Sequence, residues 1–125
     1  MNNKVEAVQQ LTLVDGVLKY SNKSVLRPFV QAIDSKTGSF TLELSDVGKY
    51  FRINSANAVT VTIPNLDFPL GSVLVFEQTG AGAITVASSA YTLRGNVLSN
   101  GQYTVMQIIK VSTTEWTIIG GIENV

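Results

Sequence analysis

The stretch that most clearly indicates the fold class reads Val59-Thr60-Val61-Thr62-Ile63. Its strict alternation places three aliphatic side chains on one face of a strand and two threonines on the other. Pro64 follows directly, and a proline ends a strand because it has no amide hydrogen to donate to the ladder. The stretch therefore predicts a strand with one face in a core and the other in solvent or against a neighbour.

Similar segments flank this strand from residue 40 onward, separated by turns rich in Gly, Asn, Pro or Ser, at a spacing typical of sandwiches and small barrels. We expect about eight strands, over residues 40–44, 50–54, 59–63, 72–78, 84–87, 92–94, 102–111 and 116–119. The continuous apolar run at 73–76 is typical of a central strand covered on both faces. The pattern predicts an all-β fold, an antiparallel β-sandwich of the jelly-roll kind.

Two connections are predicted to be hairpins. Thr79-Gly80-Ala81-Gly82-Ala83 would join the strands at 72–78 and 84–87, and a turn at 112–114 would join the long strand to the one carrying Trp116. The first connection superficially resembles a phosphate-binding glycine loop. It lacks the Lys-Ser/Thr ending and no helix is predicted after it, so its glycines are interpreted as turn residues.

Residues 1–37 differ from the rest and are interpreted as an N-terminal arm, and residues 38–125 as the β-sandwich domain. An Asp15-Gly16 pair between apolar runs predicts a hairpin over residues 11–20. An isolated hairpin is marginally stable, so we expect it to add to a sheet of its own chain or of another. Pro28 keeps the residue before it extended. The arm is therefore predicted to serve attachment or exchange between subunits.

Composition narrows the function. The 125 residues are 45% hydrophobic and only 14% charged, with nine basic and nine acidic residues and neither His nor Cys. A surface poor in charge is easily buried against a partner, because few ions must be desolvated. The sequence has no run of basic residues that could bind the phosphates of a nucleic acid. No signal core or membrane-spanning stretch is predicted.

Catalysis is not predicted, because Ser–His and Cys–His chemistry is impossible here. The carboxylates considered as an acid pair are Glu43, Asp46, Asp67 and Glu77. They are interpreted as solvated turn and edge charges, so no catalytic, metal-binding or cofactor-binding residue is assigned. Trp116 is assigned to core or interface packing rather than to ligand stacking.

Five segments follow one another in a specific order. They are Gly48-Lys49-Tyr50-Phe51-Arg52-Ile53-Asn54, Val59-Thr60-Val61-Thr62-Ile63-Pro64, Phe68-Pro69-Leu70-Gly71-Ser72-Val73, Gln78-Thr79-Gly80-Ala81-Gly82-Ala83-Ile84-Thr85-Val86-Ala87 and Trp116-Thr117-Ile118-Ile119-Gly120-Gly121. This order resembles a β-sandwich module of tailed-bacteriophage virion proteins, found in head-fibre, capsid-decoration and tail-fibre chains. The resemblance covers roughly residues 39–122. It implies a homotrimer with threonine-rich or aliphatic strand faces meeting at the axis.

A capsid decoration or cement protein is the expected member of that group, because a tail fibre needs repeats, a coiled coil or a shaft, and none is evident. Such a protein would be made in the host cytoplasm and would bind the major capsid protein on the outside of the head. Nucleic acid, membranes and small-molecule substrates are not expected partners. The residues proposed for the capsid or subunit interface are Leu11, Leu13, Val17, Leu18, Val25, Leu26, Phe29 and Val30. Completion of the sandwich core explains their pattern equally well.

Two alternatives stay open. A tail-fibre or receptor-binding tip would use a polar and aromatic patch for carbohydrate, made of Tyr91, Asn96, Asn100, Gln102 and Tyr103. A glycan hydrolase would use two of the four carboxylates considered above.

Overall fold

The computed structural model describes residues 11–14, 17–20 and 30–122. The chain divides into two units, residues 1–30 and 31–125. In the first unit, β1 (Leu11–Val14) pairs antiparallel with β2 (Val17–Tyr20), with Leu13 opposite Leu18. This pairing confirms the hairpin predicted over residues 11–20.

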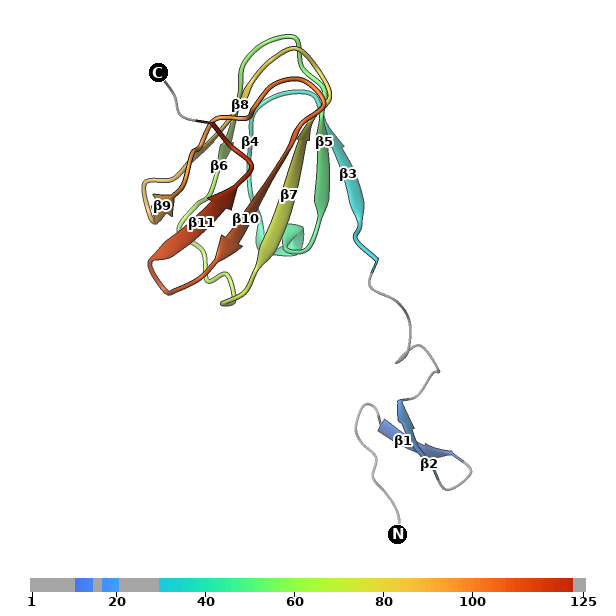
Figure 1. Cartoon of the computed structure of the whole chain (residues 1–125). Helices are drawn as coiled ribbons and strands as arrows, with labels where there is room; N and C mark the ends of the chain where they lie inside the picture. The colour runs from blue at the N-terminus through green and yellow to red at the C-terminus, as the bar shows by residue number, and fades with distance from the viewer. Residues whose placement is uncertain (1–10, 15–16, 21–29, 123–125) are drawn as a thin grey trace. The chain divides into compact units, whose positions relative to one another are not determined.

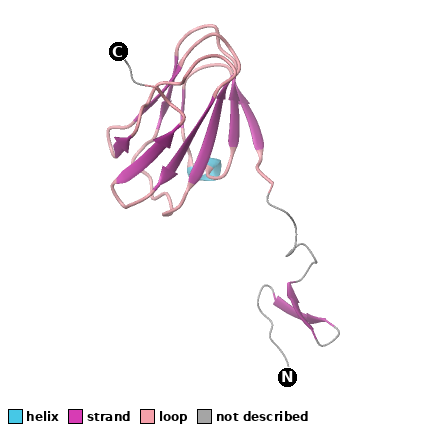
Figure 2. Cartoon of the chain, in the orientation of Figure 1, coloured by secondary structure: helices cyan, strands magenta, loops and turns pink. Residues whose placement is uncertain are grey.

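The second unit is built from nine described strands, and each of the eight predicted segments overlaps one of them. The strands are β3 (Ile33–Lys36), β4 (Phe40–Thr41), β5 (Tyr50–Ile53), β6 (Val59–Thr62), β7 (Val73–Gln78), β8 (Ile84–Ala87), β9 (Thr92–Arg94), β10 (Val105–Lys110) and β11 (Glu115–Ile119). Figure 2 shows that strands make up both layers of this unit, with one short helical turn at Leu44–Asp46. The additional strand is β3, which lies inside the stretch interpreted as the arm.

The strands wind as a mostly parallel β-solenoid of about three turns, so the prediction of an antiparallel sandwich is wrong. Successive turns are β3–β4, β5–β6 and β7–β8. The first strand of each turn enters one sheet, where β3, β5 and β7 are parallel, and the second enters the other, where β4, β6 and β8 are parallel. Figure 1 shows the two sheets facing each other. The all-β class is confirmed, while the direction of the pairing is not.

The second and third turns have the same length in both sheets. Tyr50 pairs with Val75 and Val59 pairs with Ile84, so both offsets are 25 residues (75 − 50 and 84 − 59). Equal offsets let like side chains stack from one turn to the next, as when Thr60 lies beside Thr85 and Val61 beside Val86. The chain therefore contains an internal repeat, contrary to the expectation that it has none.

The connection at 79–83 is a corner between the two sheets, so the predicted hairpin there is wrong. Its backbone stacks on the corner of the previous turn, with Gly82 N donating to Ser55 O (2.7 Å) and Thr79 N to Ile53 O (2.9 Å). A Cβ on Gly82 would lie 1.9 Å from Asn57 O. The glycines allow two corners to approach each other, and this approach directs the chain into a third turn.

After β8 the chain stops coiling and completes the larger sheet. β10 pairs antiparallel with β7, β11 antiparallel with β10, and β9 parallel with β11, giving six strands in the order β3-β5-β7-β10-β11-β9. The pairing of β10 with β11 confirms the hairpin predicted at 112–114. β7 lies between β5 and β10, which confirms that it is a central strand. The expected cover on both faces is not found within this chain, because Val73 and Val75 on its outer side are only half-buried.

The core lies between the two sheets and consists of side chains from alternate positions, as the period of a strand requires. Phe51 stacks on Phe76 with ring centroids 5.7 Å apart, and Phe68 meets Trp116 edge-on at 5.5 Å. Trp116 is fully buried, which confirms its assignment to packing. The fully buried hydrophobic residues also include Leu42, Ile53, Val59, Val61, Ile63, Leu74, Ile84, Val86, Met106 and Ile108.

Charged side chains cover the core at the β3 edge. Asp34 and Lys36 share the inner face with Phe51 and Ile53, and the Lys36 ammonium lies 4.8 Å from the centre of the Phe40 ring. Lys49 Nζ donates to Asp46 (2.9 Å) and Asp34 (3.2 Å). These hydrogen bonds raise the pKa of Lys49, and the bond from Lys49 is the main reason that the pKa of Asp34 is lowered. Inward-pointing charge on an edge strand discourages the addition of another strand.

Candidate functional site

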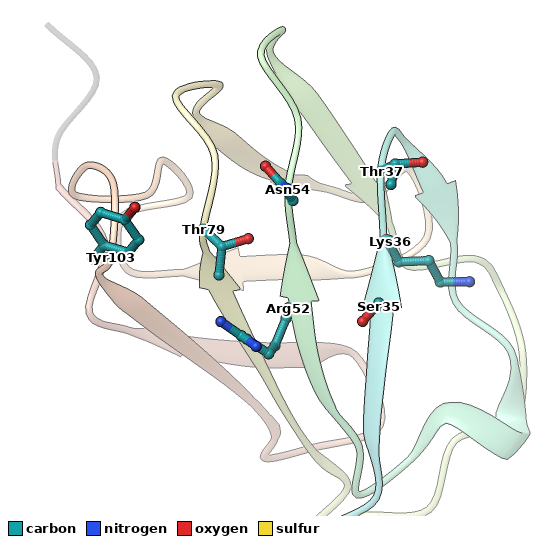
Figure 3. Close-up of a pocket in the computed structure, with 7 residues that line it drawn as sticks. All are labelled: Ser35, Lys36, Thr37, Arg52, Asn54, Thr79 and Tyr103. Atoms are coloured by element: carbon teal, nitrogen blue, oxygen red, sulfur yellow. The ribbon is translucent and has the colours of Figure 1, made fainter.

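A polar hollow of about 410 Å³ lies on the six-stranded sheet, where the parallel strands β3, β5 and β7 end and β10 begins. It is lined by Ser35, Lys36, Thr37, Arg52, Asn54, Thr79 and Tyr103. Figure 3 shows Arg52 and Asn54 in the middle of the site, with Tyr103 on one side and the β3 residues on the other. The volume falls within the range of small-molecule sites.

Tyr103 forms one side of the hollow in an unusual backbone conformation. Its φ is 68°, the one positive value found at a non-glycine residue in the described part of the chain, and its side chain is 72% exposed. An aromatic residue in the left-handed region costs of order 1–3 kcal/mol. Neighbouring hydrogen bonds hold it there, with Tyr103 N donating to Gln78 O and Gln78 N to Thr104 O (3.0 Å). The fold thus holds a large ring in solvent beside polar groups.

A buried polar network supports this end of the sheet from below. Ser99 Oγ donates to Gln78 Oε1 and accepts from Ile84 N (2.8 Å), while Gln78 Nε2 donates to Gly80 O (3.1 Å). Gln78 and Ser99 are 2% and 3% exposed. On the surface, Gln102 Nε2 donates to Thr79 O (3.1 Å) and joins the loop before β10 to the corner after β7. Hydrogen bonds therefore fix the segments that form the walls of the hollow.

The Arg52 guanidinium at the hollow has its counter-ion within the protein. Arg52 Nε donates to Glu77 Oε1 (3.3 Å), which also accepts from the Tyr50 hydroxyl (3.1 Å). Burial, and next the carboxylate of Glu77, raise the pKa of Tyr50. Lys36 contributes to the lining, but Figure 3 shows its ammonium pointing away from the other labelled residues. This ammonium lies 4.8 Å from the centre of the Phe40 ring. The hollow therefore presents hydrogen-bonding groups, with the Arg52 guanidinium already paired and the Lys36 ammonium at the Phe40 ring.

Beyond the hollow, the outer face of the six-stranded sheet, meaning the side turned away from the core, carries aliphatic side chains among polar and charged ones. Its aliphatic side chains come from four strands and are Ile33, Val73, Val75, Val105, Ile109 and Ile119. Ile33, Val105 and Ile119 are 62%, 42% and 51% exposed. Sequence patterning did not single out this face, because the run at 73–76 suggested a strand covered on both sides.

The structure separates most of the predicted carbohydrate patch. Of its five residues only Tyr103 lines the hollow. Gln102 contributes indirectly, because its Nε2 donates to the backbone oxygen of the lining residue Thr79. Tyr91 instead packs edge-on against Trp116 (6.0 Å) and donates its hydroxyl to Leu66 O. Asn96 lies beside Gly121. Arg52 and Asn54, which line the hollow together with Tyr103, are far from it in sequence.

The four carboxylates considered for an acid pair lie in different settings. Asp46 is buried and accepts from Glu43 N (2.9 Å) within the capping box of the Leu44–Asp46 turn, so its interpretation as a solvated charge is wrong. Glu43 and Asp67 are exposed, and Glu77 is half-buried in the pair with Arg52. Asp46 thus has a structural role in this turn.

The residues proposed for the capsid or subunit interface fall mainly outside the described side chains. Leu11, Leu13, Val17 and Leu18 lie on β1 and β2, of which the backbone pairing is described, while Val25, Leu26 and Phe29 lie outside the described residues. Val30 is described and is 74% exposed.

Neither a protein-family model nor a curated protein matches this sequence. Within residues 11–14, 17–20 and 30–122, no three His, Cys, Asp or Glu residues gather as a metal site would require. The same residues include no helix with the length and apolar character to cross a membrane.

Proposed function

We propose that the protein is a structural component of a bacteriophage virion, a capsid decoration protein that acts as a homotrimer on the outside of the head. The resemblance in sequence implied a sandwich, which this chain does not form. The proposal therefore depends on the outer face of the six-stranded sheet. That face combines exposed aliphatic side chains with charges that are already paired.

The aliphatic residues of the outer face favour burial. Exposed Ile33 and Ile119 lie at the two ends of a row that runs through Tyr50, Val75 and Gln107. Covering such side chains is favourable by about 25 cal/mol per Å² of apolar surface. Their extent across several strands is more typical of an interaction surface than of scattered exposed residues.

The charges on the same face do not oppose burial strongly. Arg52 pairs with Glu77 (3.3 Å) and Arg94 pairs with Glu115 (3.1 Å). Because each charge has an opposite partner within its own chain, a second copy would not need to supply a counter-ion. A surface that combines exposed aliphatic side chains with paired charges suits contact with identical copies of itself.

Association through a sheet edge is the competing arrangement. At the β3 edge, inward-pointing Asp34 and Lys36 together with Lys49 would have to be desolvated if another strand extended the core. The face is therefore favoured over this edge as the contact between copies. In this arrangement the arm, which contains its own hairpin, binds the major capsid protein.

Lysine on the outer face is expected to dissociate the trimer. Ile33→Lys and Ile119→Lys replace exposed side chains, so the monomer should fold, but each would bury an unpaired ammonium at a cost of several kcal/mol. Sedimentation velocity should give three chain masses for the natural protein and one for both variants. The matched control is Thr60→Lys, at an exposed position on the smaller sheet, which should stay trimeric. A monomeric natural protein, or trimeric Ile33→Lys and Ile119→Lys variants, would contradict the proposal.

Removal of residues 1–30 is expected to abolish attachment to heads while leaving the trimer intact. Truncation at residue 37 would be a poor test, because it would also remove β3. Purified empty heads should co-sediment with the full chain and not with the truncated one. Attachment of the truncated chain at full strength would exclude the arm as the binding element.

A further inference from the structure

The hollow offers the groups that a sugar ring requires. Ser35 and Thr79 contribute hydroxyls and Asn54 a carboxamide, and these can donate to and accept from sugar hydroxyls. Arg52 uses Nε for Glu77, and its terminal amino groups are further donors at the same place. Four residues thus contribute three kinds of polar group to one volume of about 410 Å³.

Tyr103 contributes the apolar surface against which a sugar face can pack. Tyrosine provides a large contact area with few rotatable bonds, so little side-chain entropy is lost on binding. The positive φ of this residue would be relieved by glycine, yet a tyrosine occupies the position and its ring is 72% exposed. Strain of this kind clusters at ligand sites, where the surrounding structure maintains it.

Charge restricts the kind of sugar. Glu77 lies 3.3 Å from Arg52 Nε and balances the guanidinium, and the Lys36 ammonium is directed to the Phe40 ring. A carboxylated or phosphorylated sugar would meet an acidic neighbour and no unpaired cation pointing at it. A neutral saccharide would meet hydroxyl and carboxamide dipoles, the aromatic ring and a guanidinium that already has its counter-ion in Glu77.

The site lies beyond the row of the outer face that contains Ile33, Val75 and Ile119. Ser35, Arg52 and Glu77 form the row nearest the carboxyl ends of β3, β5 and β7, and Asn54 and Thr79 follow the last residues of their strands. Association through Val75, Gln107 and Ile119 would leave the hollow at the rim of the contact. Self-association and ligand binding are thus compatible on this sheet.

We propose that this hollow is a binding site for a neutral saccharide, a hexose or N-acetylhexosamine unit of a larger glycan. The sugar packs one face on the Tyr103 ring and directs its hydroxyls to Asn54, Arg52, Thr79 and Ser35. Recognition by hydrogen bonds and ring contact, rather than by charge, makes its affinity insensitive to salt.

The test uses the full chain on an array of neutral hexose, N-acetylhexosamine and deoxyhexose oligosaccharides, with uronic-acid oligosaccharides beside them. The best neutral binder is then titrated by calorimetry against the natural protein and its variants. Tyr103→Gly removes the ring while accepting the backbone conformation, so it should fold and bind at least about tenfold more weakly. Tyr103→Phe should retain binding, and Arg52→Gln should weaken it. Thr60→Ala, on the smaller sheet, is the matched control and should bind as the natural protein does.

Three results would overturn the inference. They are an absence of binding to every neutral oligosaccharide, a preference for uronic acids that is lost at high salt, and unchanged affinity in Tyr103→Gly. Sedimentation of each variant separates this inference from the proposed assembly. A monomer that binds sugar through Tyr103 would refute the trimer and leave the site standing, whereas a Tyr103→Gly trimer with lost binding supports both.

Discussion

Replacement of Gly82 by alanine should destabilise the 31–125 unit by about 3 kcal/mol or more, in the upper range of the cost of overpacking. The added Cβ would lie 1.9 Å from Asn57 O and 2.9 Å from Ser55 O, both of which are backbone atoms that cannot rotate away. The conformation of Gly82 is itself acceptable to alanine, since its φ is not positive. The loss therefore measures how closely the third turn approaches the second.

Gly38→Ala is the matched control for this experiment. A Cβ at Gly38 would have no atom within 4 Å, and its φ is also not positive, so the substitution should be neutral or slightly stabilising. Urea unfolding of both variants at one protein concentration, followed by far-ultraviolet circular dichroism, gives the two free energies. Equal stability of Gly82→Ala and Gly38→Ala would show that the corners do not stack as described.

Replacement of Ser99 by alanine should cost about 3 kcal/mol, because it leaves two buried groups without partners at about 1–3 kcal/mol each. Gln78 Oε1 would lose its donor and the Ile84 amide would lose its acceptor. The Gln78 side chain also holds Gly80 O, so the corner beside the hollow should loosen with it.

Amide hydrogen exchange provides the second readout for Ser99→Ala. Exchange should accelerate at residues 79–84 and 101–104 more than at β6, which lies in the smaller sheet. Ser45→Ala, at an exposed position in the Leu44–Asp46 turn, should leave both stability and exchange unchanged. A stability of Ser99→Ala within about 0.5 kcal/mol of the natural protein, the range of ordinary surface substitutions, would indicate that the network does not support the site.

The candidate site could be predicted only in part. Tyr103 belongs to the carbohydrate patch of one alternative function considered from the sequence. Its neighbours in the structure, Arg52, Asn54 and Ser35, come from strands and corners 49 to 68 residues earlier (103 − 54 and 103 − 35). No local pattern connects them with Tyr103, because the contact arises from the order of strands in the sheet. The loop residues Asn96 and Asn100, which are close in sequence, do not line the hollow.

The positions of most strands could be predicted from the sequence alone. Alternation at 59–63 identified β6 and its buried face, and β-rich segments bounded by turn residues located the other strands of the 40–119 region. Alternation works at this level because the two sides of any strand face different surroundings, whatever the neighbouring strand is. The β3 strand was not predicted, because its inner face carries Asp34 and Lys36 in place of apolar residues.

Strand order and direction were decided only by the tertiary structure. Parallel and antiparallel neighbours require the same period of two, so the pattern in 59–63 fits a sandwich and a solenoid equally well. The 25-residue offset that relates Val59 to Ile84 was the available signal for coiling. What turns that offset into a solenoid is the close stacking of the corners at Gly82 and Ser55, a contact between backbones that side-chain patterns do not encode.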